Sequence, residues 1–245
     1  GMIHFVEFDQ AGPAFRENAG KFDHCPKNLD VYVKDMPERI EALRSAGYQF
    51  QKENYNEMTA PDGTVFREIH MVGHDAINIV LIEVIGMPLS FTELGFAALG
   101  PIVTTVADAT VERDFYENVI GLDLLNDNLL EGPAIEQMLD LPAGGAMEIS
   151  IWGDADSGFG RMQLVDYRGV DGKNLYPHAV PKQRGILQVN YEIMNLDVLI
   201  ERLDNAGVPW TDAGMLSVLQ GDGRFIRVQS PVGFQIEILQ KVSLL

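Results

Sequence analysis

The stretch VKDMPERIEALRSAG at residues 33–47 recurs 160 residues later as IMNLDVLIERLDNAG at residues 193–207. Both copies carry apolar side chains at helical spacing and end in Ala-Gly, which predicts an amphipathic helix stopped by a glycine. A strand-like run precedes each copy, and further strand-like runs follow it, such as NIVLIEVI at 78–85. This repetition predicts a structural unit of one strand, one helix and about three strands.

A third and more divergent copy lies between these two, at residues 102–125. Its strand leads to Asp108, where the helix is expected to begin, and Gly121 is expected to end that helix. Residues 3–10, IHFVEFDQ, have the pattern of a closing strand alone, so the chain is expected to begin inside a module. The sequence therefore predicts an α+β fold of tandem βαβββ modules, in which modules two, three and four are complete and module one is not.

Three patterns connect these modules with a known family. They are D-x-x-x-x-x-x-F-Y-x-x-V-I-G-L from Asp108 to Leu122, the Ala-Gly helix ends, and S-P-V-G-F-Q-I-E-I at 230–238. On these patterns the chain resembles the vicinal oxygen chelate superfamily, which includes glyoxalase I, bleomycin resistance proteins and extradiol dioxygenases. The resemblance implies modules that pair so that mixed sheets curve around a central cavity. It implies a glyoxalase-like domain at 1–92, with an incomplete first module, and a second one at 93–245 made of modules three and four.

Composition excludes several classes of function. The net charge is −18 and no basic patch occurs, which argues against a nucleic-acid partner. No apolar run approaches the roughly 20 residues that cross a bilayer, so no membrane partner is expected. The single cysteine, Cys25, excludes an intrachain disulfide and favours a cytoplasmic location. The expected partner is a small molecule, and a homodimer is a further hypothesis, in which a second copy closes the exposed sheet edge of the incomplete module.

The resemblance also implies a divalent metal, Fe, Mn, Zn or Ni, held on the first and last strands of paired modules. Two vicinal oxygens of a substrate would then chelate the ion. In the second pair these strand positions fall on Pro101, Gln163, Gln188 and Glu237. Proline cannot ligate a metal through its side chain, so Gln188 and Glu237 are the implied ligands, and Gln163 is expected to contact the substrate. The alternative is a metal-free polar pocket in which these side chains only form hydrogen bonds.

Five further residues are candidates. Glu83 interrupts an apolar strand, where an inward carboxylate would be costly unless it is paired, so together with Glu237 it is a candidate ligand or catalytic base. His70 and His74 could join Glu83 in an alternative metal site, although a structural role for at least one histidine is the commoner case. Tyr176 and His178 lie in the linker before module four and are expected either to close over the substrate or to be ordinary surface residues.

Two functions follow from these residues and from the resemblance. The first is an enzyme, a lyase, isomerase or dioxygenase, that acts on a small dicarbonyl or catechol-like metabolite by metal-assisted stabilisation of an enolate or catecholate. The second is a metal-free protein that binds and sequesters a small molecule, of the bleomycin-resistance type.

Overall fold

The structure, a computed structural model, describes residues 3–59, 63–157, 160–218 and 221–242. It confirms three complete βαβββ modules. Module two comprises β1 (Pro26–Val33), α1 (Met36–Ser45), β2 (Asn56–Thr59), β3 (Val65–Val72), a 3-10 turn (His74–Ala76) and β4 (Asn78–Val84). Module three comprises β5 (Phe96–Val106), α2 (Ala109–Asp114) with a π-helical continuation (Phe115–Ile120), β6 (Asp123–Glu131), α3 (Pro133–Leu139), β7 (Ala146–Gly153) and β8 (Met162–Arg168). After a second 3-10 turn (Tyr176–His178), module four comprises β9 (Gln188–Glu192), α4 (Leu196–Asn205), β10 (Trp210–Val218), β11 (Gly221–Gln229) and β12 (Gln235–Lys241).

The helix ends follow the sequence signals. The Asp108 carboxylate accepts the Thr110 N–H at 2.8 Å, and the Asn195 side chain accepts the Asp197 N–H at 3.1 Å. These bonds satisfy N–H groups that the first turn of a helix leaves without a partner. Gly121 directly follows the π-helical continuation of α2 with a φ of 87°, a left-handed conformation that glycine adopts without strain.

The modules pair differently from the expectation. Modules two and three share an eight-stranded sheet of order β2-β3-β4-β1-β5-β8-β7-β6, and module four forms a separate sheet of order β10-β11-β12-β9. The joint is antiparallel pairing of β1 with β5, the first strand of each module. Each of these strands also pairs in parallel with the last strand of its own module, β4 or β8, so its other edge is free to meet the neighbouring module. The domain boundary expected between residues 92 and 93 therefore separates two modules that share one sheet.

The expected closing strand at residues 3–10 is wrong. Residues 3–8 have no regular structure, and Phe5 is 93% exposed. A strand needs a ladder of backbone hydrogen bonds to a neighbour, and none of the strands in the described part of the chain includes residues 3–8. The residues that follow it run instead beside the linker before module four, with bridges between Ala14 and Arg184 and between His24 and Asn174.

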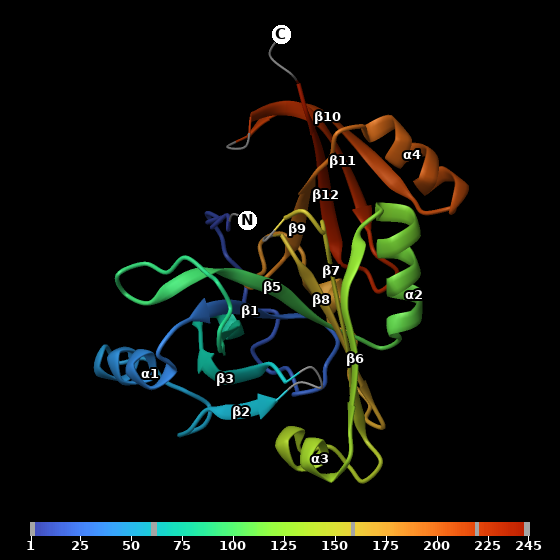
Figure 1. The fold of residues 1–245 in the computed structure, drawn as a ribbon. Coiled ribbons are helices and arrows are strands. Elements are labelled where there is room, and N and C mark those ends of the chain that lie inside the picture. Colours follow the sequence, from blue (N-terminus) through green and yellow to red (C-terminus); the bar gives the residue numbers. More distant parts are fainter. Residues whose placement is uncertain (1–2, 60–62, 158–159, 219–220, 243–245) are drawn as a thin grey trace.

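One large core joins module four to module three. The π-helical continuation of α2 packs against α4, and Figure 1 shows α2 and α4 on the same side of the molecule. The largest fully buried side chains of this core include Tyr116, Trp152, Tyr176 and Phe234. A smaller core lies under α1, around Val33 and Met36. No helix within the described residues is long and apolar enough to cross a membrane.

Candidate functional site

The eight-stranded sheet has an outer face, covered by α1 and α2, and an inner face on the opposite side. Val33 of β1 packs in the core under α1, as do Ile69 and Leu81 of the neighbouring strands. Because successive side chains of a strand alternate between faces, Asn28, Asp30 and Tyr32 lie on the inner face. By the same alternation Gln163 of β8 is on the inner face, because Met162 and Leu164 belong to the core around α2.

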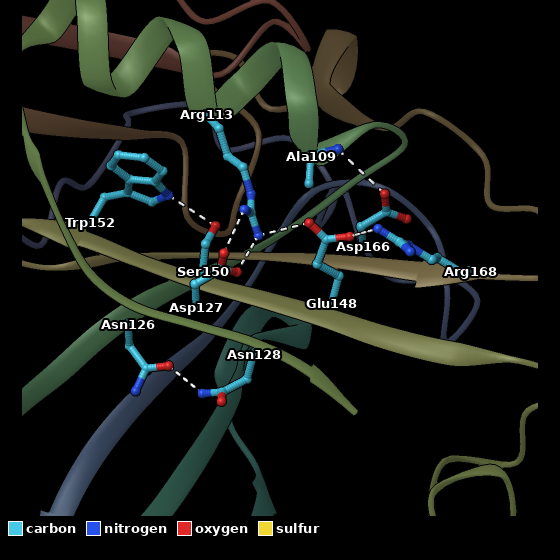
Figure 2. Close-up of polar contacts among 10 residues, drawn as sticks. All are labelled: Ala109, Arg113, Asn126, Asp127, Asn128, Glu148, Ser150, Trp152, Asp166 and Arg168. Carbon is cyan, nitrogen blue, oxygen red and sulfur yellow. Dashed lines mark hydrogen bonds and ion pairs between the residues drawn. The ribbon is translucent and has the colours of Figure 1, made fainter. Parts of the chain in front are cut away.

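Polar side chains of the outer face hold α2 against the sheet. In Figure 2, Arg113 of α2 forms a two-pronged contact with Asp127, at 2.9 and 2.5 Å, and reaches Glu148 at 2.7 Å. Glu148 also pairs with Arg168, and Asp166 accepts the Ala109 N–H at the start of the helix at 3.3 Å. These contacts are structural, since each connects the helix to a strand or one strand to the next. The polar side chains that remain available to bind a ligand are therefore those of the inner face.

Glu83 is on the outer face and acts as a helix cap. Its carboxylate accepts the Asp35 N–H at 2.6 Å and the Met36 N–H at 3.4 Å, and it pairs with Arg67 at 3.0 Å. The other modules repeat this contact, because Asp166 accepts the Ala109 N–H and Gln240 accepts the Leu196 N–H. Glu83 therefore matches these two capping residues and does not match Glu237.

The residue of module two that matches Glu237 is Val80, three positions before Glu83. Val80 pairs with Asp30 as Gln163 pairs with Val103 and Glu237 with Asn190. The positions of the eight-stranded sheet that match Gln188 and Glu237 in register are thus Asn28, Val80, Pro101 and Gln163, on its inner face. This set offers two amides and no carboxylate or imidazole, which does not fit a divalent ion.

The four-stranded sheet brings Gln188 and Glu237 together, as the resemblance implied. Gln188 Nε2 donates to Glu237 Oε2 at 3.0 Å, on the sheet face turned away from α4. The same carboxylate is paired with Arg227, whose Nε lies 2.7 Å from Glu237 Oε1. A guanidinium in contact with the carboxylate would repel a metal ion, so this pair does not fit one either. Across the described residues no cluster of three histidine, cysteine, aspartate or glutamate side chains is arranged to hold a metal.

The two histidines of the alternative metal site lie apart. His70 is on the inner face, where its Nε2 lies 3.0 Å from Glu68 Oε1. His74 is exposed in the turn after β3. Glu83 is on the opposite face of the sheet, so these three side chains do not converge.

Tyr176 and His178 do not form a lid together. Tyr176 is 1% exposed, its hydroxyl donates to the Thr105 carbonyl oxygen at 3.0 Å, and its ring centroid lies 6.0 Å from that of Phe234. His178 is exposed on the same short turn. The structure thus places Tyr176 in the core and His178 at the surface.

Asp30 is the residue that sequence analysis missed. It is 4% exposed on the inner face, and its Oδ1 has no hydrogen-bond partner. Burial, together with the nearby Glu68, raises the pKa of Asp30 well above its usual range. The signal in the sequence is a carboxylate two residues after Asn28 in the first strand, which puts both side chains on one face.

Two further buried polar atoms on the inner face lack a partner, Thr105 Oγ1 and Arg161 Nε. Thr105 alternates with the core residue Val106, and Arg161 precedes the core residue Met162. Nearby, Asn78 Nδ2 donates to Asn28 Oδ1 at 3.1 Å. The inner face thus combines the amides of Asn28 and Gln163 with three buried polar atoms that have no hydrogen-bond partner among the described residues, Asp30 Oδ1, Thr105 Oγ1 and Arg161 Nε. An oxygen- or nitrogen-bearing small molecule would satisfy such groups.

Comparison with solved structures identifies the fold. A variant of glyoxalase I from Zea mays matches with a TM-score of 0.59 and 15% identity over 89% of this chain and 69% of that chain. Glyoxalase I from Zea mays itself matches with a TM-score of 0.52 and 12% identity over the same shares. No protein-family model and no curated protein matches the sequence. The chain therefore has the glyoxalase fold, and the resemblance predicted from its sequence is confirmed at the level of the fold.

Proposed function

We propose that the protein binds a small, oxygen-rich organic molecule on the inner face of the eight-stranded sheet, and that it does so without a metal ion. The observation that carries this proposal is the buried Asp30 with Oδ1 unpartnered, on the same sheet face as the amides of Asn28 and Gln163. Leaving a buried polar group without a hydrogen bond is costly, and a bound molecule that supplies the bond removes that cost. Amides donate and accept, so they suit vicinal carbonyl or hydroxyl oxygens.

Of the two functions considered, the donor sets favour metal-free binding of the sequestration type. At Asn28 and Gln163 the positions implied for ligands hold amides, which supply hydrogen bonds but not the charge that a divalent ion needs. At Glu237 the charge is already balanced by Arg227. We keep a cytoplasmic location as part of the proposal, because Cys25, the single cysteine, is buried and reduced.

A second candidate function is proton transfer on the bound molecule. The contact between His70 and Glu68 favours it, because a carboxylate bonded to one ring nitrogen holds an imidazole in the orientation of a general base. Glu68 is close enough to Asp30 to influence its titration, so the pair lies beside the proposed ligand site. An isomerase or lyase working by acid–base catalysis would use His70 to take the proton and Glu68 to orient the ring.

The metal content of the purified protein tests the metal-free part of the proposal. After growth with Fe, Mn, Zn and Ni, elemental analysis is expected to find no metal near stoichiometric amounts. The Glu237→Ala variant should give the same result as the unchanged protein. Near-stoichiometric metal that disappears in Glu237→Ala would contradict the proposal and restore a chelate mechanism at the four-stranded sheet.

A further inference from the structure

The unpartnered groups of the inner face differ in what they require. Asp30 Oδ1 lacks a donor, and no hydrogen bond or ion pair reaches it from the described residues. Glu68, a second acid on the same face across β4, also raises the pKa of Asp30, so the surroundings of Asp30 suit a positive group. The Arg161 guanidinium, by contrast, is positively charged, and its Nε lacks an acceptor, while its Nη2 donates to the Ser157 carbonyl oxygen at 3.5 Å.

Asp30 and Arg161 lie on opposite sides of β5. Asp30 is on β1, which flanks β5 on one side, and Arg161 immediately precedes β8, which flanks it on the other. Neighbouring strands lie about 4.8 Å apart, so the two backbones are roughly 10 Å apart, and side chains extending inward shorten the gap. Tyr32 lies next to Asp30, since the Tyr32 ring and the Asp30 Cβ both lie against Gly100 of β5.

We propose that the ligand of this face is a zwitterion, a free amino acid or a closely similar molecule, whose ammonium group binds at Asp30 and Glu68 and whose carboxylate binds at Arg161. This inference rests on the proposed function, because it names the chemical class of the same ligand. The ammonium supplies both the missing donors and the missing positive charge at Asp30. The carboxylate supplies the acceptor that Arg161 Nε lacks.

The other charged and titratable groups nearby are compatible with this arrangement. His70 forms its hydrogen bond with Glu68 and not with Asp30, so no described side chain supplies a hydrogen bond to Asp30 Oδ1. The aromatic ring of Tyr32 lies against Gly100 together with Asp30 Cβ, and such a ring suits an ammonium group. Since burial favours the protonated form of Asp30 in the free protein, binding of a cation there should release a proton from its carboxyl group.

The test compares each proteinogenic amino acid with its N-acetyl derivative, which keeps the carboxylate but lacks the positive charge, and with its methyl ester, which keeps the ammonium. Binding is measured by thermal shift and then by calorimetry in two buffers of different ionisation enthalpy. At least one amino acid is expected to raise Tm and to release a proton on binding, and its two derivatives are expected to bind more weakly. An N-acetyl derivative that binds as well as the parent amino acid overturns the inference.

Variants locate the ammonium group. Asp30→Asn is expected to weaken binding by roughly 100-fold, which is the scale found when one side of a buried charge pair is truncated. Glu68→Gln should weaken it less, because Glu68 is part-exposed, and it serves as the second variant if Asp30→Asn does not fold. The exposed Asp171→Asn is the matched control and should bind like the unchanged protein. Unchanged affinity in both Asp30→Asn and Glu68→Gln overturns the inference.

The outcomes also separate this inference from the proposed function. If no amino acid binds, but a neutral dicarbonyl or catechol probe binds and is lost in the Asn28→Ala and Gln163→Ala double variant, the inference fails and the proposed function stands. If neither kind of probe binds, both fail.

Discussion

Replacing Glu112 with glutamine is expected to stabilise the protein by about 3 kcal/mol at pH values above the pKa of this carboxyl group. Glu112 is 1% exposed and lies between α2 and the turn that precedes β12, where its Oε1 accepts the Val232 N–H at 2.7 Å. Its Oε2 has no partner. Burial raises the pKa of Glu112 to about 7, against the lowering effect of its hydrogen bonds from Val232 and Ser230.

The sign of the pH dependence follows from that shift. Because the folded pKa of Glu112 is above the unfolded value of 4.5, ionisation is harder in the folded state. The free energy of unfolding therefore falls as pH rises from 4.5 through 7, and the loss is complete above 7. Glutamine cannot ionise but keeps an oxygen for the Val232 N–H, so Glu112→Gln should remove this loss. Denaturant unfolding across that pH range measures it.

The control for this prediction is Glu117→Gln. Glu117 is exposed on the π-helical continuation of α2, so its replacement changes the net charge equally without removing a buried carboxyl. Its free energy of unfolding should follow that of the unchanged protein. A Glu112→Gln variant that is less stable than the unchanged protein above the pKa would show that the Glu112 charge is needed where it lies.

Replacing Tyr176 with alanine is expected to destabilise the protein by about 3–5 kcal/mol, the usual cost of removing a large buried aromatic side chain. The ring is fully buried against Phe234, and the hydroxyl holds the Thr105 carbonyl oxygen. The loss should appear as a lower midpoint of denaturant unfolding, whether or not a ligand is present. His178→Ala is the matched control on the same 3-10 turn and should leave stability unchanged, because His178 is exposed. A Tyr176→Ala variant of normal stability that has lost only ligand binding would support the lid instead.

Much of the fold could be predicted because each module carries its own signals. The amphipathic helices, the helix start at Asp108 and the glycine stops depend on local sequence, and all occur where the patterns place them. Which modules share a sheet depends instead on which strand edges meet, and β1 and β5 are separated by a whole module in the sequence. No local pattern encodes that choice, and the pairing of modules two and three was not foreseen.

The site was harder to predict for a different reason. Counting along an alternating strand fixes which residues share a face, but not which face is turned inward. Glu83 was a candidate because a carboxylate in an apolar strand is unusual, yet it serves α1 on the outer face. The helix-capping contacts made by Glu83, Asp166 and Gln240 supply the alignment of the modules that sequence alone lacks. That alignment shows that Val80, and not Glu83, is the inner-face residue of β4 that matches Glu237. The acidic residue of the candidate site is then Asp30.

The most direct test of the central claim is to compare ligand affinity in two double variants, one for each sheet. A molecule that raises Tm of the unchanged protein is titrated into Asn28→Ala/Gln163→Ala, on the inner face of the eight-stranded sheet, and into Gln188→Ala/Glu237→Ala, on the four-stranded sheet. We expect the first variant to lose at least about tenfold in affinity, equivalent to about 1.4 kcal/mol, and the second to bind like the unchanged protein. Normal binding by the first variant and loss in the second would contradict the account and move the site to Gln188 and Glu237.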